Sequence, residues 1–261
     1  MKIPKSSVAL ACALALASLP AAAGVVIQQE QREPGGETPL VQTTMYIDAG
    51  RLRIEVRSAE GEHTITIFDE SKQVLWVIDR VAGTYYEMTA AKMAEMKKRM
   101  DEARKTMEAQ LAQMPPERRK MIEEMMKQQM GGASDMTVRE MGRGEKIGSF
   151  TCIHYEQLAG GKRSGEVWTA SPDQLQLAEA EYKTFQALGR FLAPLGQSAP
   201  GGAGLVPASR HIEGFPVRSL AYDGGQAVAE EKVTKAERRA LEPGLFTLPP
   251  GLEKTEMDVE E

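Results

Sequence analysis

The chain has 261 residues, of which 42% are hydrophobic and 26% are charged, and its formal net charge is −5. This composition is typical of a folded globular protein and excludes a disordered or collagen-like chain. The negative balance argues against nucleic acid or an anionic membrane surface as the main partner.

The first 23 residues have the features of a secretory signal peptide. Two lysines precede a short apolar run over residues 8–19, and three alanines then offer a cleavage site before Gly24. The run is shorter than the roughly 20 residues that span a bilayer. Cys12 lies inside the apolar run, whereas a lipid-attachment cysteine would come after it. We therefore expect a periplasmic protein that starts at Gly24, has a net charge of −7 and contains no transmembrane segment.

From Gly24 to about Met88, apolar and polar side chains alternate, which is the pattern of half-buried antiparallel strands. Short turns rich in Gly, Asp, Glu and Ser separate the runs. Residues 74–78 are apolar on both faces, which predicts a central strand. We expect a meander of about six strands.

At Thr89 the hydrophobic period changes to that of a helix. Thr89 is a suitable N-cap for a helix over residues 90–113, which Pro115 and the residue after it terminate. A second helix follows to about Met130. Residues 90–130 are therefore predicted to form a helical hairpin inserted into a sheet protein.

Strands resume near Met136 in a single domain that we expect to span residues 24–252. The later elements, in chain order, are a hairpin over 151–156 and 165–169, one or two helices over 172–192, a Gly- and Pro-rich loop over 196–207, two strands over 216–222 and 227–235, and an acidic tail over 253–261.

Methionine is the most unusual feature of the composition, because ten of the 15 methionines lie between Met88 and Met130. Along the first predicted helix they form a stripe opposite a charged face. Three explanations stay open: packing of the hairpin, an adaptable surface for hydrophobic ligands or varied partners, and capture of Cu(I) by thioethers. Copper sites usually combine methionine with His or Cys, and the hairpin has neither.

The mature chain has one cysteine, Cys152, so no internal disulfide can form. Cys152 and His154 share one face of a predicted strand, but a metal site would need further ligands, and only His63 and His211 remain among the histidines. We interpret Cys152 as a small buried hydrophobic residue. The chain has no G-x-S-x-G, H-E-x-x-H, C-x-x-C or P-loop signature. We predict a non-enzymatic protein without catalytic residues, cofactor or metal.

Three segments together resemble a known family. They are G-S-F-T-C-I-H-Y from Gly148, G-E-V-W-T-A from Gly165, and L-F-T-L-P-P-G-L from Leu245. Their order is similar to that of exported bacterial proteins catalogued as a domain of unknown function. The resemblance implies a fold like that of the lipoprotein carriers LolA and LolB, in which a curved antiparallel sheet holds an apolar ligand under helices. No catalytic residue carries over.

We therefore expect an α+β fold with one curved antiparallel sheet of about ten strands, a half-barrel whose concave face is covered by the 90–130 hairpin and by a second helix over 172–192. The expected function is binding of a hydrophobic ligand, an acyl chain or a lipoprotein, between sheet and helices. The alternatives are a structural or chaperone-like envelope protein and a methionine-based copper binder. The residues expected at the ligand interface are Trp76, Met93, Met96, Met100, Met107 and Trp168.

Overall fold

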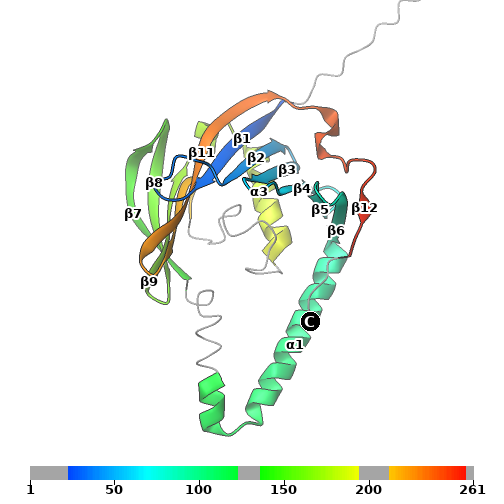
Figure 1. The fold of residues 1–261 in the computed structure, drawn as a ribbon, viewed down its shortest axis with the longest axis vertical. Coiled ribbons are helices and arrows are strands. Elements are labelled where there is room, and N and C mark those ends of the chain that lie inside the picture. Colours follow the sequence, from blue (N-terminus) through cyan, green and yellow to red (C-terminus); the bar gives the residue numbers. More distant parts are fainter. Residues whose placement is uncertain (1–22, 123–135, 194–211, 257–261) are drawn as a thin grey trace, which may run out of the picture.

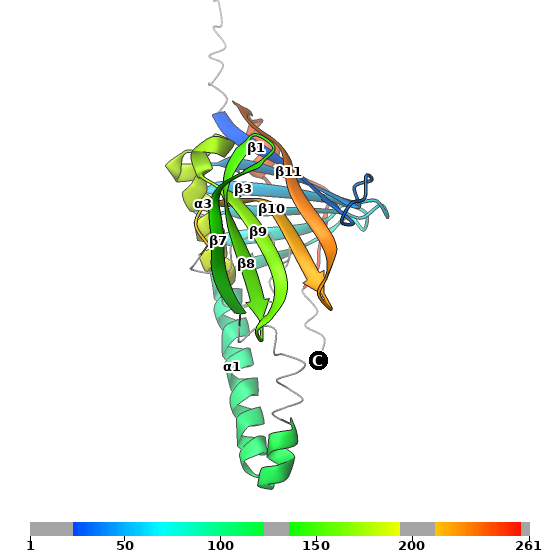
Figure 2. The same ribbon diagram turned by 90° about the vertical axis from the view of Figure 1, so that its left-hand side faces the viewer.

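A computed structural model describes residues 23–122, 136–193 and 212–256. These residues form one 12-stranded sheet in the order β12-β6-β5-β4-β3-β2-β1-β11-β10-β9-β8-β7. Neighbouring strands are antiparallel except β12 and β6, which are parallel. The sheet is strongly curved (Figures 1 and 2). The predicted α+β half-barrel is therefore confirmed, and its sheet has 12 strands where about ten were expected.

The strands follow the alternation of the sequence closely. They are β1 (Ala23–Arg32), β2 (Val41–Asp48), β3 (Arg51–Ser58), β4 (His63–Asp69), β5 (Val74–Asp79), β6 (Thr84–Thr89), β7 (Met136–Ile147), β8 (Phe150–Ala159), β9 (Lys162–Ala170), β10 (Phe215–Asp223), β11 (Gln226–Ala240) and β12 (Glu253–Lys254). The helical elements are α1 (Ala90–Ala112), a helical segment over 116–122, η1 (Pro172–Leu175), α3 (Glu179–Leu192) and η3 (Pro243–Phe246).

The main core lies between the concave face of the sheet and α3. One face of α3 is apolar and buried, and Figure 1 shows this helix inside the curve of the sheet. Phe191 packs against Phe68 of β4 with ring centroids 5.4 Å apart, and Phe185 packs edge-on against Phe215 of β10 at 5.2 Å. The predicted cover by a helix in residues 172–192 is therefore confirmed.

Polar contacts fix α3 on the sheet. The turn between β2 and β3 contains Gly50 in the left-handed conformation (φ +78°). The N–H of Gly50 donates to Oγ1 of Thr184, a fully buried residue of α3, at 2.9 Å. The Arg238 guanidinium of β11 donates to both carboxylate oxygens of Glu181, at 2.8 and 2.6 Å. These contacts tie α3 to two separate parts of the sheet.

A second apolar cluster lies on the opposite face of the sheet. It is formed by Val26, Ile65, Ile67 and Ile78 of the strands together with Leu241 and Phe246 of the C-terminal segment. After β11 the chain reaches the far edge of the sheet, where β12 pairs with β6 (Figure 1). The tail was expected to be frayed, but its first residues, Glu253 and Lys254, form this strand, while residues 257–261 lie outside the described part.

Helix α1 begins as predicted, with Oγ1 of Thr89 accepting the N–H of Lys92 at 3.2 Å. It does not cover the concave face: it leaves the sheet edge at β6 and projects away from it (Figures 1 and 2). Met93 is its one buried residue. The expected cover by the hairpin is therefore wrong. Helix α3 packs on the concave face instead, and most residues that follow Met93 and Met96 along α1 are charged or exposed.

The hairpin turn itself is well bonded. After Pro115 the chain is helical again over 116–122, and the Arg119 guanidinium donates to the carbonyls of Leu111 at 2.9 Å and Ala112 at 2.8 Å. These carbonyls lie at the end of α1, where no further helical N–H can reach them. Arg119 therefore holds the second helical segment against the first, and the rest of the predicted second helix, to Met130, lies outside the described residues.

Candidate ligand-binding site

The four methionines predicted at the ligand interface run from the core outward along α1. Met93 is 3% exposed and belongs to the main core, and Met96 is half-buried against it. Met100 and Met107 are 49% and 36% exposed. The structure thus places the first two on the core and the other two on the projecting arm, where their thioethers extend the apolar surface into solvent.

The two predicted tryptophans do not join this row. Trp76 packs against the second cluster, on the face opposite to Leu75 and Val77 of the main core, and its indole N–H donates to Glu87 at 2.9 Å. Trp76 was expected beside the methionines of α1, and the structure separates it from them because neighbouring strand residues point to opposite faces.

Trp168 is 5% exposed and is enclosed by polar partners. The His154 ring stacks on it at 4.3 Å, the Arg218 guanidinium lies 4.6 Å from its centroid, and its N–H donates to Glu145 at 2.8 Å. These contacts and its place in the main core give Trp168 a structural environment rather than an open binding surface.

An ion-pair network continues along the same strands. The Arg163 guanidinium donates to the Glu156 carboxylate at 2.9 Å, and Arg139 reaches its other oxygen at 2.5 Å. The Glu156 side chain is only 5% exposed. Hydrogen bonds from Arg163 and then Arg139 lower the pKa of Glu156, although partial burial opposes them. The Glu166 carboxylate accepts the Tyr222 hydroxyl at 2.8 Å, a hydrogen bond that raises the pKa of Tyr222.

This network predicts acid sensitivity. A carboxyl whose pKa is lowered by folding stabilises the protein above its unfolded pKa, and that contribution is lost as the pH falls through the folded value. Replacing Glu156 by Gln should therefore destabilise the protein at pH 7, and the difference from wild type should shrink as the pH falls below about 4.3. Urea unfolding at a series of pH values measures this difference. A difference that is constant from pH 7 to pH 3 would contradict it.

Cys152 is 1% exposed in the main core, and burial raises the pKa of its thiol. The neutral thiol is a poor nucleophile and a poor metal ligand. Among the described residues, no three His, Cys, Asp or Glu side chains are grouped as they would be around a metal ion.

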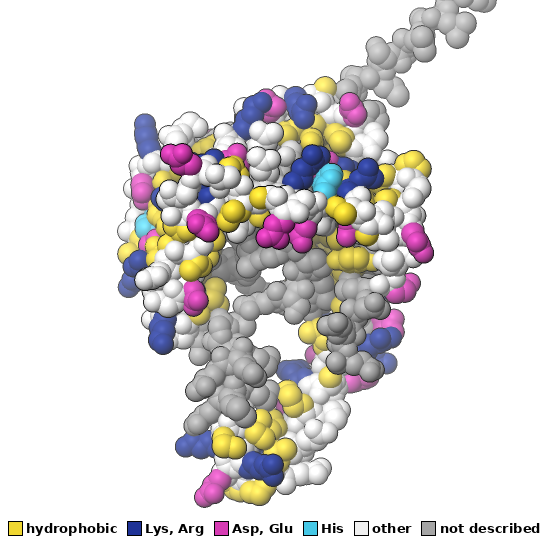
Figure 3. Space-filling model, viewed as in Figure 1, with side chains coloured by type: hydrophobic (Ala, Val, Ile, Leu, Met, Phe, Trp, Pro, Cys, Tyr) yellow, Lys and Arg dark blue, Asp and Glu magenta, His cyan; other side chains and the backbone are white. Residues whose placement is uncertain are grey.

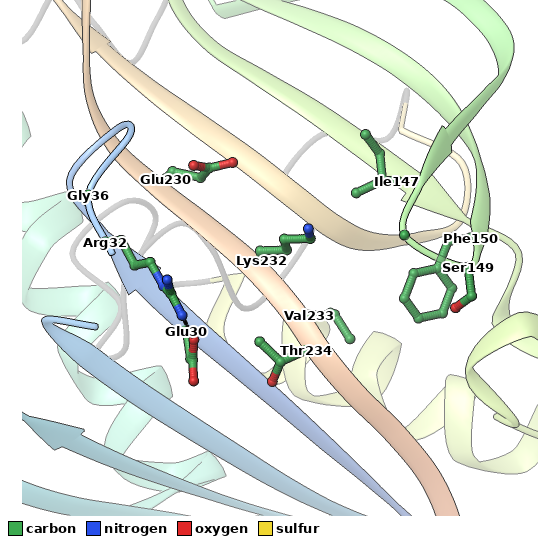
Figure 4. Close-up of a pocket in the computed structure, with 11 residues that line it drawn as sticks. Glu30, Arg32, Gly36, Ile147, Ser149, Phe150, Glu230, Lys232, Val233 and Thr234 are labelled. Carbon is green, nitrogen blue, oxygen red and sulfur yellow. Dashed lines mark hydrogen bonds and ion pairs between the residues drawn. The ribbon is translucent and has the colours of Figure 1, made fainter. Parts of the chain in front are cut away.

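A cavity of about 480 Å³ lies where β1, β11 and the turn between β7 and β8 approach one another (Figure 4). Its lining is mixed: four charged side chains lie beside the large apolar side chains of Ile147, Phe150 and Val233. Arg32 pairs with Glu30, and Glu230 pairs with Arg218 at 2.6 Å, so much of its charge is neutralised internally. Figure 3 shows the mixed charge of one face of the molecule. Sequence reasoning did not identify this cavity, because its lining comes from three distant segments.

Sequence reasoning also missed two polar residues on the concave side. Gln29 continues the face of β1 that carries Val25 and Ile27, and it is 5% exposed. Glu231 lies on the neighbouring strand β11, opposite Gln31. The signal was present in β1, where a glutamine takes the place of the next apolar residue in an alternating strand.

The family model that matches the chain covers residues 100–252 and is described as a domain of unknown function, DUF4412. The chain belongs to this family. The match confirms the resemblance drawn from the three motifs. In this DUF4412 protein, two of those motifs form the β8–β9 hairpin, and the third supplies Phe246 and Leu252 to the second cluster.

No curated protein matches the sequence of this DUF4412 chain. Three solved structures are similar in outline. An uncharacterized conserved protein from Thermus thermophilus is 10% identical (90% of this chain, 91% of that one, TM-score 0.44). MucB of the Pseudomonas aeruginosa MucA/MucB complex is 9% identical (89% and 58%, TM-score 0.39), and a LolA superfamily protein from Nitrosomonas europaea is 10% identical (88% and 92%, TM-score 0.28). We take no function from these similarities.

Within the described residues, neither α1 nor α3 has both the length and the apolar character needed to cross a membrane.

Proposed function

We propose that this protein is an exported, non-enzymatic binding protein of the periplasm that holds a hydrophobic ligand, an acyl chain or a lipidated protein, against the concave side of its sheet and the adjoining methionines of α1. Binding would rest on burial, which contributes about 0.8 kcal/mol for each methylene removed from water.

The observation that supports this proposal is the row of methionines that begins inside the core and ends in solvent. Met93 is buried, Met96 half-buried, and Met100 and Met107 exposed. Exposed apolar surface that is continuous with the core is typical of sites where proteins bind ligands or partners. Methionine suits this role because its unbranched, polarisable side chain repacks around different shapes.

The same row favours a second candidate function, a chaperone-like interaction with apolar segments of other envelope proteins. Met121, in the helical segment after α1, is 58% exposed and extends the apolar surface to the tip of the described arm. The two functions differ in occupant: a carrier retains a small ligand through purification, and an interaction protein releases its partner.

Native mass spectrometry of the protein purified from the periplasm tests the proposal. We expect a polypeptide that starts at Gly24, because the signal peptide should be removed before it, with an additional mass in the range of a lipid. Delipidation with organic solvent should return the mass of the bare polypeptide. A first residue of lipid-modified Cys12 would overturn the proposed location, and a bare polypeptide that takes up no lipid when mixed with one would favour the interaction protein.

A further inference from the structure

A polar region lies on the concave side of the sheet where β1 meets β11. On β1, Val25 and Ile27 are fully buried in the main core, and Gln29 is the next residue on the same face. Its cross-strand neighbour on β2, Thr43, is 8% exposed. The apolar face of β1 therefore ends in a buried amide rather than in solvent.

The Gln29 amide has an unsatisfied acceptor. Its Oε1 atom is buried, and it receives no hydrogen bond from the part of the chain that the structure describes. Buried carbonyl oxygens nearly always accept a hydrogen bond, because leaving one unpaired forfeits its interaction with water. An unpaired acceptor at the end of an apolar face is available to a ligand that brings a hydrogen-bond donor.

Glu231 supplies a second acceptor on the same face. Gln29 is paired with Val233, and Gln31 with Glu231, so Gln29 and Glu231 are diagonal neighbours, roughly 7–8 Å apart between backbones. Among the described residues Glu231 forms no ion pair. Burial raises the pKa of its carboxyl, and a hydrogen bond from Ser219, its neighbour on β10, opposes that effect.

We propose that Gln29 and Glu231 bind the primary ammonium head group of a long-chain amphiphile whose alkyl chain lies along the apolar part of the concave side. This inference rests on the proposed function, and it adds the chemical class of the ligand. An ammonium group has three N–H donors and no acceptor, so it can donate to the Gln29 amide and to the Glu231 carboxylate together.

Charge favours the same class of ligand. An anionic head group would meet the Glu231 carboxylate at close range, and like charges repel there more strongly than in water. A neutral alcohol could donate to only one of the two acceptors. The chain as a whole carries a net charge of −5, which favours the approach of cations over that of anions.

Isothermal titration of the mature chain with dodecylamine, dodecanoate and butylamine at pH 7, below their micelle concentrations, tests the inference. Wild type should bind dodecylamine at least about tenfold more tightly than dodecanoate, because hydrogen bonds to charged groups are strong. Butylamine should bind far more weakly, because it lacks most of the alkyl chain.

The variant Glu231→Gln should reduce the preference for dodecylamine to about twofold or less, and Gln29→Leu should weaken dodecylamine binding while leaving dodecanoate binding unchanged. Glu237→Gln is the matched control, because Glu237 lies on the same strand, half-exposed and paired with Lys235 at 2.7 Å. Thermal unfolding of each variant checks its folding. The comparison of the three ligands on the wild-type protein tests the proposal even if a variant does not fold.

The outcomes separate the two proposals. If dodecylamine and dodecanoate bind equally well and Glu231→Gln changes neither affinity, the head-group assignment is overturned and the proposed function stands. If neither ligand binds, both are overturned. Tighter binding of dodecanoate than of dodecylamine would exclude an ammonium ligand while supporting a hydrophobic one.

Discussion

A variant in which a flexible linker replaces residues 97–130 is expected to fold and to bind a fluorescent alkyl-chain probe at least about tenfold more weakly than wild type. The described arm beyond Met96 includes no buried residue, so its loss should leave both apolar clusters intact. Its exposed methionines would no longer cover the ligand, and each methylene returned to water costs about 0.8 kcal/mol. Probe fluorescence measures binding, and circular dichroism measures folding.

A matched control distinguishes the apolar row from the arm in general. Replacing Lys98 and Lys105, which are exposed on α1, by Ser should leave probe binding unchanged, whereas replacing Met100 and Met107 by Ser should weaken it. A folded deletion variant with full affinity would remove the arm from the binding site. If the deletion variant unfolds, the arm is part of the structural core, and the methionines need no ligand to explain them.

The sequence alone predicted most strands and the start of α1. Alternation in residues 41–88 placed β2 to β6 within a few residues, because one wet face imposes a period of two. The Thr89 N-cap was also predicted, and its hydroxyl accepts the Lys92 N–H. These features depend on neighbours in the chain, so a local pattern is sufficient to predict them.

The placement of the layers could not be predicted in the same way. A stripe of methionines shows which side chains share one side of a helix, but it does not show which surface that side meets. The structure packs α3 on the concave face, where its apolar residues Phe185, Leu188 and Phe191 belong to the main core. The arm was therefore left to project, and Met100 and Met107 became exposed.

The residues predicted at the ligand interface do not form one group in the structure. Met93 lies in the main core with Met96 packed against it, whereas Trp76 faces the C-terminal segment, which no local pattern links to β5. Gln29 and Glu231 are 202 positions apart and become neighbours only through the pairing of β1 with β11. Such pairs depend on the sheet order, and periodicity carries no information about it.

Exchange of four methionines for leucine should distinguish a hydrophobic role of these residues from copper binding. A thioether that lines an apolar site contributes area and shape, so exchange for Leu usually costs less than about 1.5 kcal/mol. A Cu(I) ligand contributes a sulfur lone pair, which Leu lacks. The variant with Leu at Met93, Met96, Met100 and Met107 should therefore keep its fold and most of its affinity for the alkyl-chain probe.

The wild-type chain should show no tight uptake of Cu(I) when it competes with a chromophoric chelator. The exposed fractions support this expectation, since Met93 is buried in the core while Met100 and Met107 lie about two and four helical turns further along α1. Sulfurs spread along a helix in this way cannot surround one ion, because a helix rises 1.5 Å per residue. Stoichiometric copper binding that disappears in the four-Leu variant would reject the hydrophobic-ligand proposal and establish a metal site. Loss of folding in that variant would instead show that these methionines are needed for packing alone.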